Sequence, residues 1–231
     1  MRQFAVEIVQ VATSRGLFQV WCGGAVPAFQ AGQAALVLSD LPSQPFLRVA
    51  VYPFHVQPES FEFCLDQVQP GEAAMPGHPL AGLRPGDKLN VVGPCGRGFD
   101  LGERPANLLV VAASLARLVA LVDDATARRW AISLLSLNAD AQPGVPKEVE
   151  VHRGALTAEL AEWADLIALD CSEPGSLVER IRTLRPDRPR GFVQALLSVP
   201  MPCGTGACQA CRVEQSPRHQ LACVDGPVMR Y

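Results

Sequence analysis

The sequence lacks the features that would direct it to nucleic acid or to a membrane. It contains no run of basic residues, and its formal net charge is −3, so no surface for a phosphate backbone is expected. Its longest apolar stretch, Leu108 to Ala116, is too short to span a bilayer. No apolar segment typical of a secretory signal follows the first residues. We therefore expect no nucleic-acid partner and no membrane span.

Four of the eight cysteines have no regular spacing that would indicate a disulfide framework. Cys22, Cys64, Cys95 and Cys171 are scattered through the first three quarters of the chain. Free cysteines of this kind behave as small hydrophobic residues, and thiols stay reduced in the cytosol. We read them as buried, reduced thiols and expect a cytoplasmic protein.

The other four cysteines form the most informative pattern in the sequence. Cys203, Cys208, Cys211 and Cys223 follow the order C-x4-C-x2-C-x11-C. This is the spacing of a plant-type [2Fe–2S] loop. Gly204 and Gly206 lie between the first two cysteines, where a loop must let its backbone approach an inorganic core closely. The pattern predicts a [2Fe–2S] cluster held by these four thiolates.

Zinc is the rival ligand for four cysteines. Structural zinc sites usually present two separated C-x2-C pairs, and only Cys208 and Cys211 form such a pair here. The spacing favours the cluster, with zinc and uncoordinated thiols as the alternatives. A Rieske-type centre would need two histidines, whereas the interval contains His219 alone.

Two compositional zones precede the cysteine loop. Up to about residue 101, short β-like runs alternate with Pro and Gly turns, which predicts a small antiparallel barrel or sandwich. From about residue 105 to residue 199, apolar strand runs alternate with helical stretches, which predicts a parallel sheet with helices on its faces. Within this second zone we expect strands at 107–113, 131–137, 148–152, 166–170 and 192–198, and helices at 115–129, 155–164 and 175–184.

The whole chain resembles the electron-transfer subunit of the heterodimeric dihydroorotate dehydrogenases, a branch of the ferredoxin-reductase-like flavoproteins. The likeness is strongest in Leu83-Arg-Pro-Gly-Asp-Lys-Leu-Asn-Val-Val-Gly-Pro-Cys-Gly-Arg-Gly-Phe and in Met201-Pro-Cys-Gly-Thr-Gly-Ala-Cys-Gln-Ala-Cys with the later Cys223-Val-Asp-Gly-Pro-Val-Met. The resemblance implies a β-barrel plus α/β architecture. An antiparallel FAD-binding barrel spans 1–103, a Rossmann-like parallel-sheet domain 104–199 and a cluster-binding segment 200–231.

The flavin motif of the family is only partly present. Relatives have Arg-Pro-x-Ser, with the arginine on the pyrophosphate and the serine beside the flavin ring, and the matching stretch is Arg48-Val49-Ala50-Val51. A second family signature, Gly-Thr, stands as Gly77-His78. An arginine fork suits a phosphate, so the resemblance implies FAD held by Arg48, by backbone groups of Val49, Ala50 and Val51, and by Gly77 and His78.

The nicotinamide motif departs further. Relatives have a glycine-rich turn after the first strand of the α/β domain, where the backbone approaches the pyrophosphate. The same place here reads Ala112-Ala-Ser-Leu-Ala-Arg-Leu, without glycine. The late Cys-Gly-Pro motif stands as Cys171-Ser-Glu-Pro. We expect NAD(H) binding to be weakened or lost, with Ser114 capping the following helix and Arg117 on a solvated helix face or at some other anion.

The resemblance implies an electron-transfer subunit of pyrimidine biosynthesis rather than an independent catalyst. The partner would be a flavoenzyme catalytic subunit similar to dihydroorotate dehydrogenase, in a hetero-oligomer. We assign no catalytic residue. Two alternatives remain, a self-sufficient NAD(P)H-dependent flavin reductase and a non-redox interaction subunit whose four cysteines hold zinc.

Overall fold

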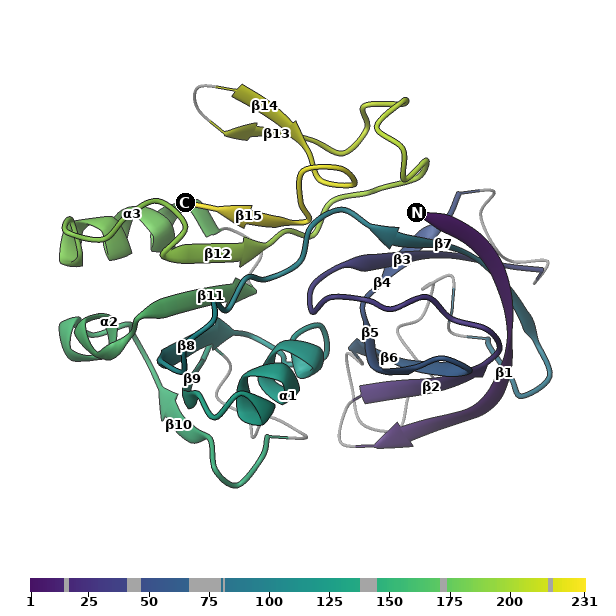
Figure 1. Ribbon diagram of the computed structural model, residues 1–231, viewed down its shortest axis with the longest axis horizontal. Helices are drawn as coiled ribbons and strands as arrows, with labels where there is room; N and C mark the ends of the chain where they lie inside the picture. Colours follow the sequence, from purple (N-terminus) through teal and green to yellow (C-terminus); the bar gives the residue numbers. More distant parts are fainter. Residues whose placement is uncertain are drawn as a thin grey trace.

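The first domain is a curled antiparallel sheet built from strands of alternating burial. The computed structural model describes residues 1–14, 17–40, 47–66, 80, 82–137, 145–170, 174–215 and 218–231. The strands are β1 (Arg2–Ser14), β2 (Leu17–Gly23), β3 (Ala34–Ser39), β4 (Val49–Val51), β5 (Pro53–Gln57), β6 (Ser60–Asp66) and β7 (Lys88–Cys95). They pair in the order β4-β3-β7-β1-β2-β6-β5 and roll into a half-barrel (Figure 1).

The barrel strands follow the alternation expected of sheets with one buried face. In β7, Leu89, Val91 and Cys95 are buried, whereas Lys88 and Asn90 between them are not. Phe61 and Phe63 of β6 point to the same side and are fully buried. Their rings contribute to the apolar core that the curled sheet encloses.

The second domain is a parallel sheet covered by helices. Its strands are β8 (Asn107–Ala112), β9 (Ala131–Ser136), β10 (Glu150–Arg153), β11 (Leu166–Asp170) and β12 (Val193–Leu196), and its helices are α1 (Val119–Ala127), α2 (Ala158–Trp163) and α3 (Pro174–Leu184). Every residue of β11 and β12 is buried. Continuous burial is what a parallel sheet requires when both of its faces are covered.

The strand order places a switch point at the centre of this sheet. The chain runs from β8 outward to β9 and β10, then returns to the other side of β8 to form β11 and β12. The crevice between the carboxyl ends of β8 and β11 is therefore the place where open α/β sheets bind their ligands. Asp170, the last residue of β11, stands beside Ala112, the last residue of β8.

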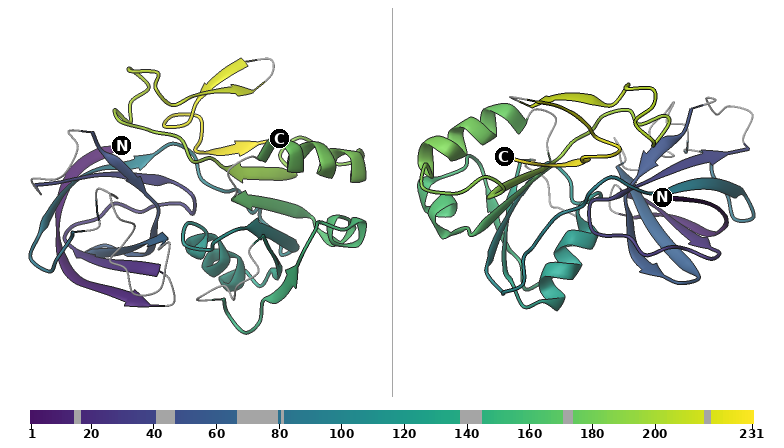
Figure 2. Two further views of the ribbon diagram at one scale, coloured as in Figure 1. Left: turned by 180° about the vertical axis from the view of Figure 1, so that it is seen from behind. Right: turned by 45° about the horizontal axis from the view of Figure 1, so that its top comes forward.

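The C-terminal segment returns to the joint between the two domains. It forms a hairpin of β13 (Arg212–Gln215) and β14 (Arg218–Leu221), and then β15 (Val228–Arg230), which pairs antiparallel with β12. The Arg97 N–H donates to the Gly226 carbonyl, and Arg97 forms a bridge with Pro227. Figure 2 shows this segment lying over the joint. The cysteine loop is thus fixed by backbone contacts to both domains.

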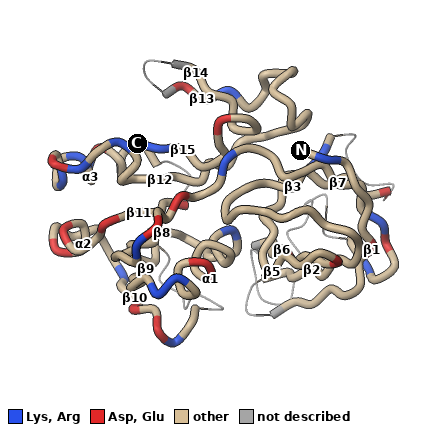
Figure 3. The backbone as a smooth tube through the Cα atoms, in the orientation of Figure 1, with Lys and Arg blue, Asp and Glu red and all other residues tan. Residues whose placement is uncertain are grey.

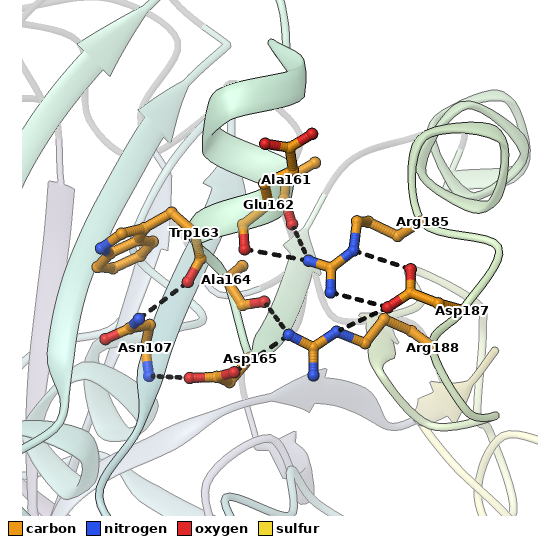
Figure 4. A network of polar contacts seen from close by, with 9 residues as sticks. All are labelled: Asn107, Ala161, Glu162, Trp163, Ala164, Asp165, Arg185, Asp187 and Arg188. Carbon is orange, nitrogen blue, oxygen red and sulfur yellow. Dashed lines mark hydrogen bonds and ion pairs between the residues drawn. The ribbon is translucent and has the colours of Figure 1, made fainter.

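Arginines that follow α3 close the carboxyl end of α2 (Figure 4). Arg185 Nη1 donates to the Ala161 and Glu162 carbonyls at 2.8 and 3.1 Å, and Arg188 Nη2 donates to the Ala164 carbonyl at 3.2 Å. The last carbonyls of a helix have no partner within it, so these guanidinium groups satisfy them. Arg185 and Arg188 therefore stabilise the packing of α2 against the segment that follows α3.

Three elements differ from the expected ones. The strand β5 was not expected, because Pro53 and His55 interrupt the apolar pattern. The helix predicted from residue 115 begins only at Val119, since the residues after β8 form a turn. The segment after residue 200 does not stand apart, because β15 extends the sheet of the second domain. The domain boundaries at 103 and 199 stay predictions.

Among the described residues, no helix is both long enough and apolar enough to cross a membrane.

A glycine pair tests how the C-terminal segment is fixed. Gly96 has φ +73°, and an added Cβ would overlap the Gly226 carbonyl oxygen, whereas Gly102 has φ +72° and open space around it. Gly96→Ala should lower the free energy of unfolding by more than about 4 kcal/mol. Gly102→Ala should cost only the left-handed strain of about 1–2 kcal/mol. Urea unfolding measures both, and equal losses would show that the close approach does not hold the segment.

Candidate metal centre and cofactor sites

The first cysteine pair lies on a tight loop that glycine makes possible. Gly204 and Gly206 have φ values of +69° and +79°, which residues with a Cβ rarely adopt. The loop folds back so that Cys203 Sγ and Cys208 Sγ lie 3.2 Å apart. Cys208 is exposed and Cys203 half-buried, so this pair faces outward.

A hairpin brings the second pair together. Arg212, next to Cys211, stands opposite Leu221, and the Ala222 N–H donates to the Cys211 carbonyl at 3.0 Å. Cys211 Sγ and Cys223 Sγ consequently lie 3.3 Å apart, and both residues are buried. The β13–β14 hairpin therefore brings together two cysteines that are separated by eleven residues in the sequence.

The two pairs suit a two-iron cluster better than a single zinc ion. A [2Fe–2S] cluster takes four cysteines, two on each iron, whereas zinc draws four ligands around one point. One pair is partly exposed and the other is buried, so each iron of a two-iron cluster would take one pair. The four cysteines stay the predicted ligands.

One cysteine of each pair has a shifted pKa, and the two shifts are opposite in direction. Hydrogen bonds from the backbone and side chain of Cys208, with others from Thr205, lower the pKa of Cys203 to about 6. Burial, followed by the contact with Cys211, raises the pKa of Cys223 to about 12. Cys203 is therefore a thiolate at neutral pH, whereas Cys223 must release its proton when it binds a metal.

The cysteine loop rests on the barrel. A Cβ at Gly204 would come within 2.7 Å of Leu36 Cδ1, in β3, and 3.3 Å of Cys95 Sγ, at the end of β7. Cys95 is 1% exposed, and burial raises its pKa to about 11, as expected for a thiol that serves as packing. Only a residue without a side chain allows the loop to approach β3 and β7 this closely.

The predicted flavin residues lie on the edge strand beside this contact. Arg48 Nη1 donates to the Asn90 carbonyl at 2.9 Å, and Nη2 donates to Asn90 Oδ1 at 2.6 Å. Nη1 also lies 3.4 Å from the Leu36 carbonyl, so the guanidinium is held against β3 and β7, next to the edge strand. Val51 is 1% exposed and points into the barrel core.

Backbone groups on β4 suit a flavin better than its side chains do. Val49, Ala50 and Val51 pair with β3 on one side only, and β4 is the edge of the described sheet. An edge strand presents N–H and C=O groups that a ligand can use. Arg48 and this edge therefore fit a flavin nucleotide. Gly77 and His78 lie outside the described residues.

The turn after β8 is filled with apolar side chains. Ser114 Oγ accepts from the Ala116 N–H at 3.1 Å, which closes the turn but does not cap α1, because α1 starts after Leu118. Leu115, Ala116 and Leu118 are all buried. The expected cap is therefore wrong. The turn has no glycine, and the N–H groups of Ala116 and Leu118 already bond within it, which is unfavourable for a pyrophosphate.

One functional cluster was missed from the sequence. Arg117 does not lie on a solvated face: its Nε donates to Asp170 Oδ2 at 3.0 Å, and its Nη2 donates to Asp170 Oδ1. Its guanidinium lies 5.4 Å from the centre of the Tyr52 ring, in the barrel. The sequence does place a charged residue at or shortly after the end of each of two apolar strands. The ion pair between Arg117 and Asp170 could not be predicted, because it depends on β8 and β11 being neighbours in the sheet. Cys171, the next residue, lies outside the described part.

Comparisons with known proteins agree with this geometry. Residues 200–231 match the family of the iron-sulfur cluster binding domain of dihydroorotate dehydrogenase B. The chain is 28% identical over 177 residues to the dihydroorotate dehydrogenase B (NAD(+)) electron transfer subunit of Desulforamulus reducens, across 64% of this chain. The match spans 66% of that relative, slightly under two thirds of its length.

Solved structures share the fold. The NADH-dependent reduced ferredoxin-NADP oxidoreductase has a TM-score of 0.64 at 19% identity, over 97% of this chain and 87% of that one. Phthalate dioxygenase reductase has a TM-score of 0.60 at 15% identity, over 89% and 70%. The predicted resemblance, the predicted fold class and the iron–sulfur character of the C-terminal segment are confirmed.

Alanine substitutions test the ligand set. Cys208→Ala and Cys211→Ala each remove one member of a pair, so iron and acid-labile sulfide in the purified protein should fall at least about tenfold. Cys22→Ala is the control, because Cys22 is equally a free cysteine but is buried in the barrel core. Iron analysis and visible absorption measure the effect. Full iron content in both loop variants would exclude these residues as ligands.

Proposed function

We propose that this protein is the electron-transfer subunit of a multi-subunit flavoprotein oxidoreductase. It relays single electrons through a [2Fe–2S] cluster on Cys203, Cys208, Cys211 and Cys223, in company with FAD on the barrel. The catalytic partner is a flavoenzyme of the dihydroorotate dehydrogenase type. The match of residues 200–231 to the corresponding iron-sulfur domain supports this assignment.

The observation that carries the proposal is the contact between the cysteine loop and the flavin-facing strands. Leu36 touches the loop at Gly204, and in the sheet Leu36 stands directly opposite Ala50 of β4. The proposed flavin residues and the proposed cluster residues are therefore neighbours across one strand. An electron carrier needs such proximity, whereas a structural zinc site does not.

The chain would combine a barrel and a cysteine loop because their two cofactors exchange different numbers of electrons in one step. A flavin exchanges electrons in pairs or singly, and a [2Fe–2S] centre passes one electron at a time. The chain's own part is to hold the phosphates at Arg48, to support the ring with the backbone of β4 and to fix the loop on Leu36.

The partner surface is the outer side of the cysteine loop. Residues 201–211 contain no charged side chain, and Figure 3 shows charge concentrated on other parts of the molecule. Val224 is 46% exposed, and its Cγ2 lies 3.1 Å from the Cβ position of Gly206. An uncharged loop with an exposed apolar residue beside Gly206 suits a stable protein interface. The hetero-oligomer would form here.

The alternatives fit less well. A self-sufficient NAD(P)H-dependent reductase needs a nucleotide turn, and the turn after β8 is packed with apolar side chains. A structural zinc site usually presents two C-x2-C pairs, and only Cys208 and Cys211 form such a pair here. A cytoplasmic location accompanies the proposal, because a subunit of this kind works with reduced thiols and a cytoplasmic partner.

Anaerobic spectroscopy with the native partner tests the function. The protein, purified together with its co-eluting flavoenzyme, should show reddish-brown cluster absorption with yellow flavin bands. Substrate of the flavoenzyme should produce the electron paramagnetic resonance signal of a reduced [2Fe–2S] centre. A colourless protein containing zinc without iron would disprove the proposal. So would a monomer that oxidises NADH rapidly without a partner.

A matched pair of valines tests the docking surface. Val224→Lys should weaken the complex with the flavoenzyme at least about tenfold, because it places a charge in the interface. Val9→Lys is the control, since Val9 is 64% exposed but lies on β1 of the barrel. Size-exclusion chromatography and calorimetry measure the affinity, with iron content verified in both variants. If the two variants bound the flavoenzyme with equal affinity, the interface would not include Val224.

A further inference from the structure

The switch-point crevice of the parallel sheet is filled by the chain itself. Ligands of open α/β sheets enter between the carboxyl ends of the strands at which the order reverses, here β8 and β11. Ala112 and Asp170 end these strands side by side. Arg117 reaches back from the turn after β8 to Asp170, so an ion pair spans the entrance.

The pair is held on both members. Asp170 has a side chain 6% exposed, and Arg117 has one 21% exposed. Both Nε and Nη2 of Arg117 donate to the carboxylate, which is the bidentate geometry that fixes a guanidinium most firmly. The two charges neutralise each other, so the pair presents no net charge that would attract a phosphate.

The barrel completes the closure. The Arg117 guanidinium stacks over the ring of Tyr52, whose hydroxyl donates to the Leu197 carbonyl at 3.4 Å. Ala116, the preceding residue, packs against Leu17 and Phe54 of the barrel. Among the described residues, side chains from both domains therefore meet at the ends of β8 and β11.

We propose that Arg117 and Asp170 form a built-in closure of the switch-point crevice that excludes nicotinamide nucleotides from this chain. A nicotinamide ring would have to displace the stacked guanidinium from Tyr52, and the freed Asp170 carboxylate would remain buried beside the phosphates. Exclusion therefore follows first from the volume that the two side chains take up, and the cost of a desolvated, unpaired charge adds to it. The parallel sheet then serves as a scaffold for β15 and the cysteine loop. This inference goes beyond the electron relay and does not depend on the identity of the partner.

Two double variants separate the volume of the pair from its charge. Arg117→Met with Asp170→Asn removes the charges but keeps most of the volume, so the crevice stays filled. Arg117→Ala with Asp170→Ala removes charge and volume together, so the crevice opens. Replacement of a buried ion pair by neutral groups of similar size is often tolerated, and both variants leave no single buried charge.

Direct binding of reduced nicotinamide mononucleotide, followed by its fluorescence, compares the full-length proteins. This probe lacks the adenylate half, so it reports the room at the ion pair rather than at the glycine-free turn. Wild type and the Met/Asn variant should show no saturable binding up to about 1 mM. The Ala/Ala variant should bind at least about tenfold more tightly than the Met/Asn variant.

Wild type is also titrated with NADH and NADPH. Saturable binding of either in the micromolar range would overturn the proposal, whatever the variants do. It is also overturned if the Ala/Ala variant, folded by circular dichroism, binds no better than the Met/Asn variant. Should the Ala/Ala variant not fold, Arg117→Ser with Asp170→Ser takes its place, since serine lets water hydrate the opened crevice. Neither titration requires electron transfer, so a failure of the relay would be recognised separately.

Discussion

The close approach of backbone at Gly96 and Gly226 is the constraint on which the arrangement of this protein depends. The chain leaves the barrel through Gly96 and Arg97, and at the same point the C-terminal segment crosses it and bonds to Arg97. Because Gly96 has no side chain, the segment can lie against the joint and continue into β15, at the edge of the parallel sheet. Barrel, sheet and cysteine loop become one body.

This body brings the proposed flavin and cluster residues together. The loop touches β3 through Gly204, and β3 supports β4 with its open backbone edge. At the other interface, Arg117, Asp170 and Tyr52 lie together at the switch point of the parallel sheet, where we propose that they exclude a nucleotide. The same architecture can therefore serve as a relay between proteins rather than as an oxidase of soluble nucleotides.

Local patterns predicted the local parts of the structure. The cysteine spacing indicated the cluster because a metal loop is encoded within a few residues, and the apolar runs indicated most strands of both domains. Contacts that depend on the order of strands in a sheet could not be predicted. In the sequence, nothing distinguishes β15 from an irregular C-terminal segment. Arg117 contacts Asp170 only because β8 and β11 are neighbours. The late start of α1 was not predicted for a related reason. Ala116 is apolar because it packs on the barrel, and Leu115 because it packs in the main core, rather than because they belong to a helix.

Contacts between residues close in sequence form the cysteine pairs, whereas contacts between residues far apart in sequence fix the position of the cysteine loop. Cys203 and Cys208 are five residues apart, and Cys211 and Cys223 twelve, so the ligand set can assemble within its own segment. Its placement depends on partners such as Arg230 and Asp100, which are 130 residues apart. Loops closed over such distances form late in folding, after local hairpins. The sequence-local cysteine pairs can therefore form before the segment that carries them docks on the two domains.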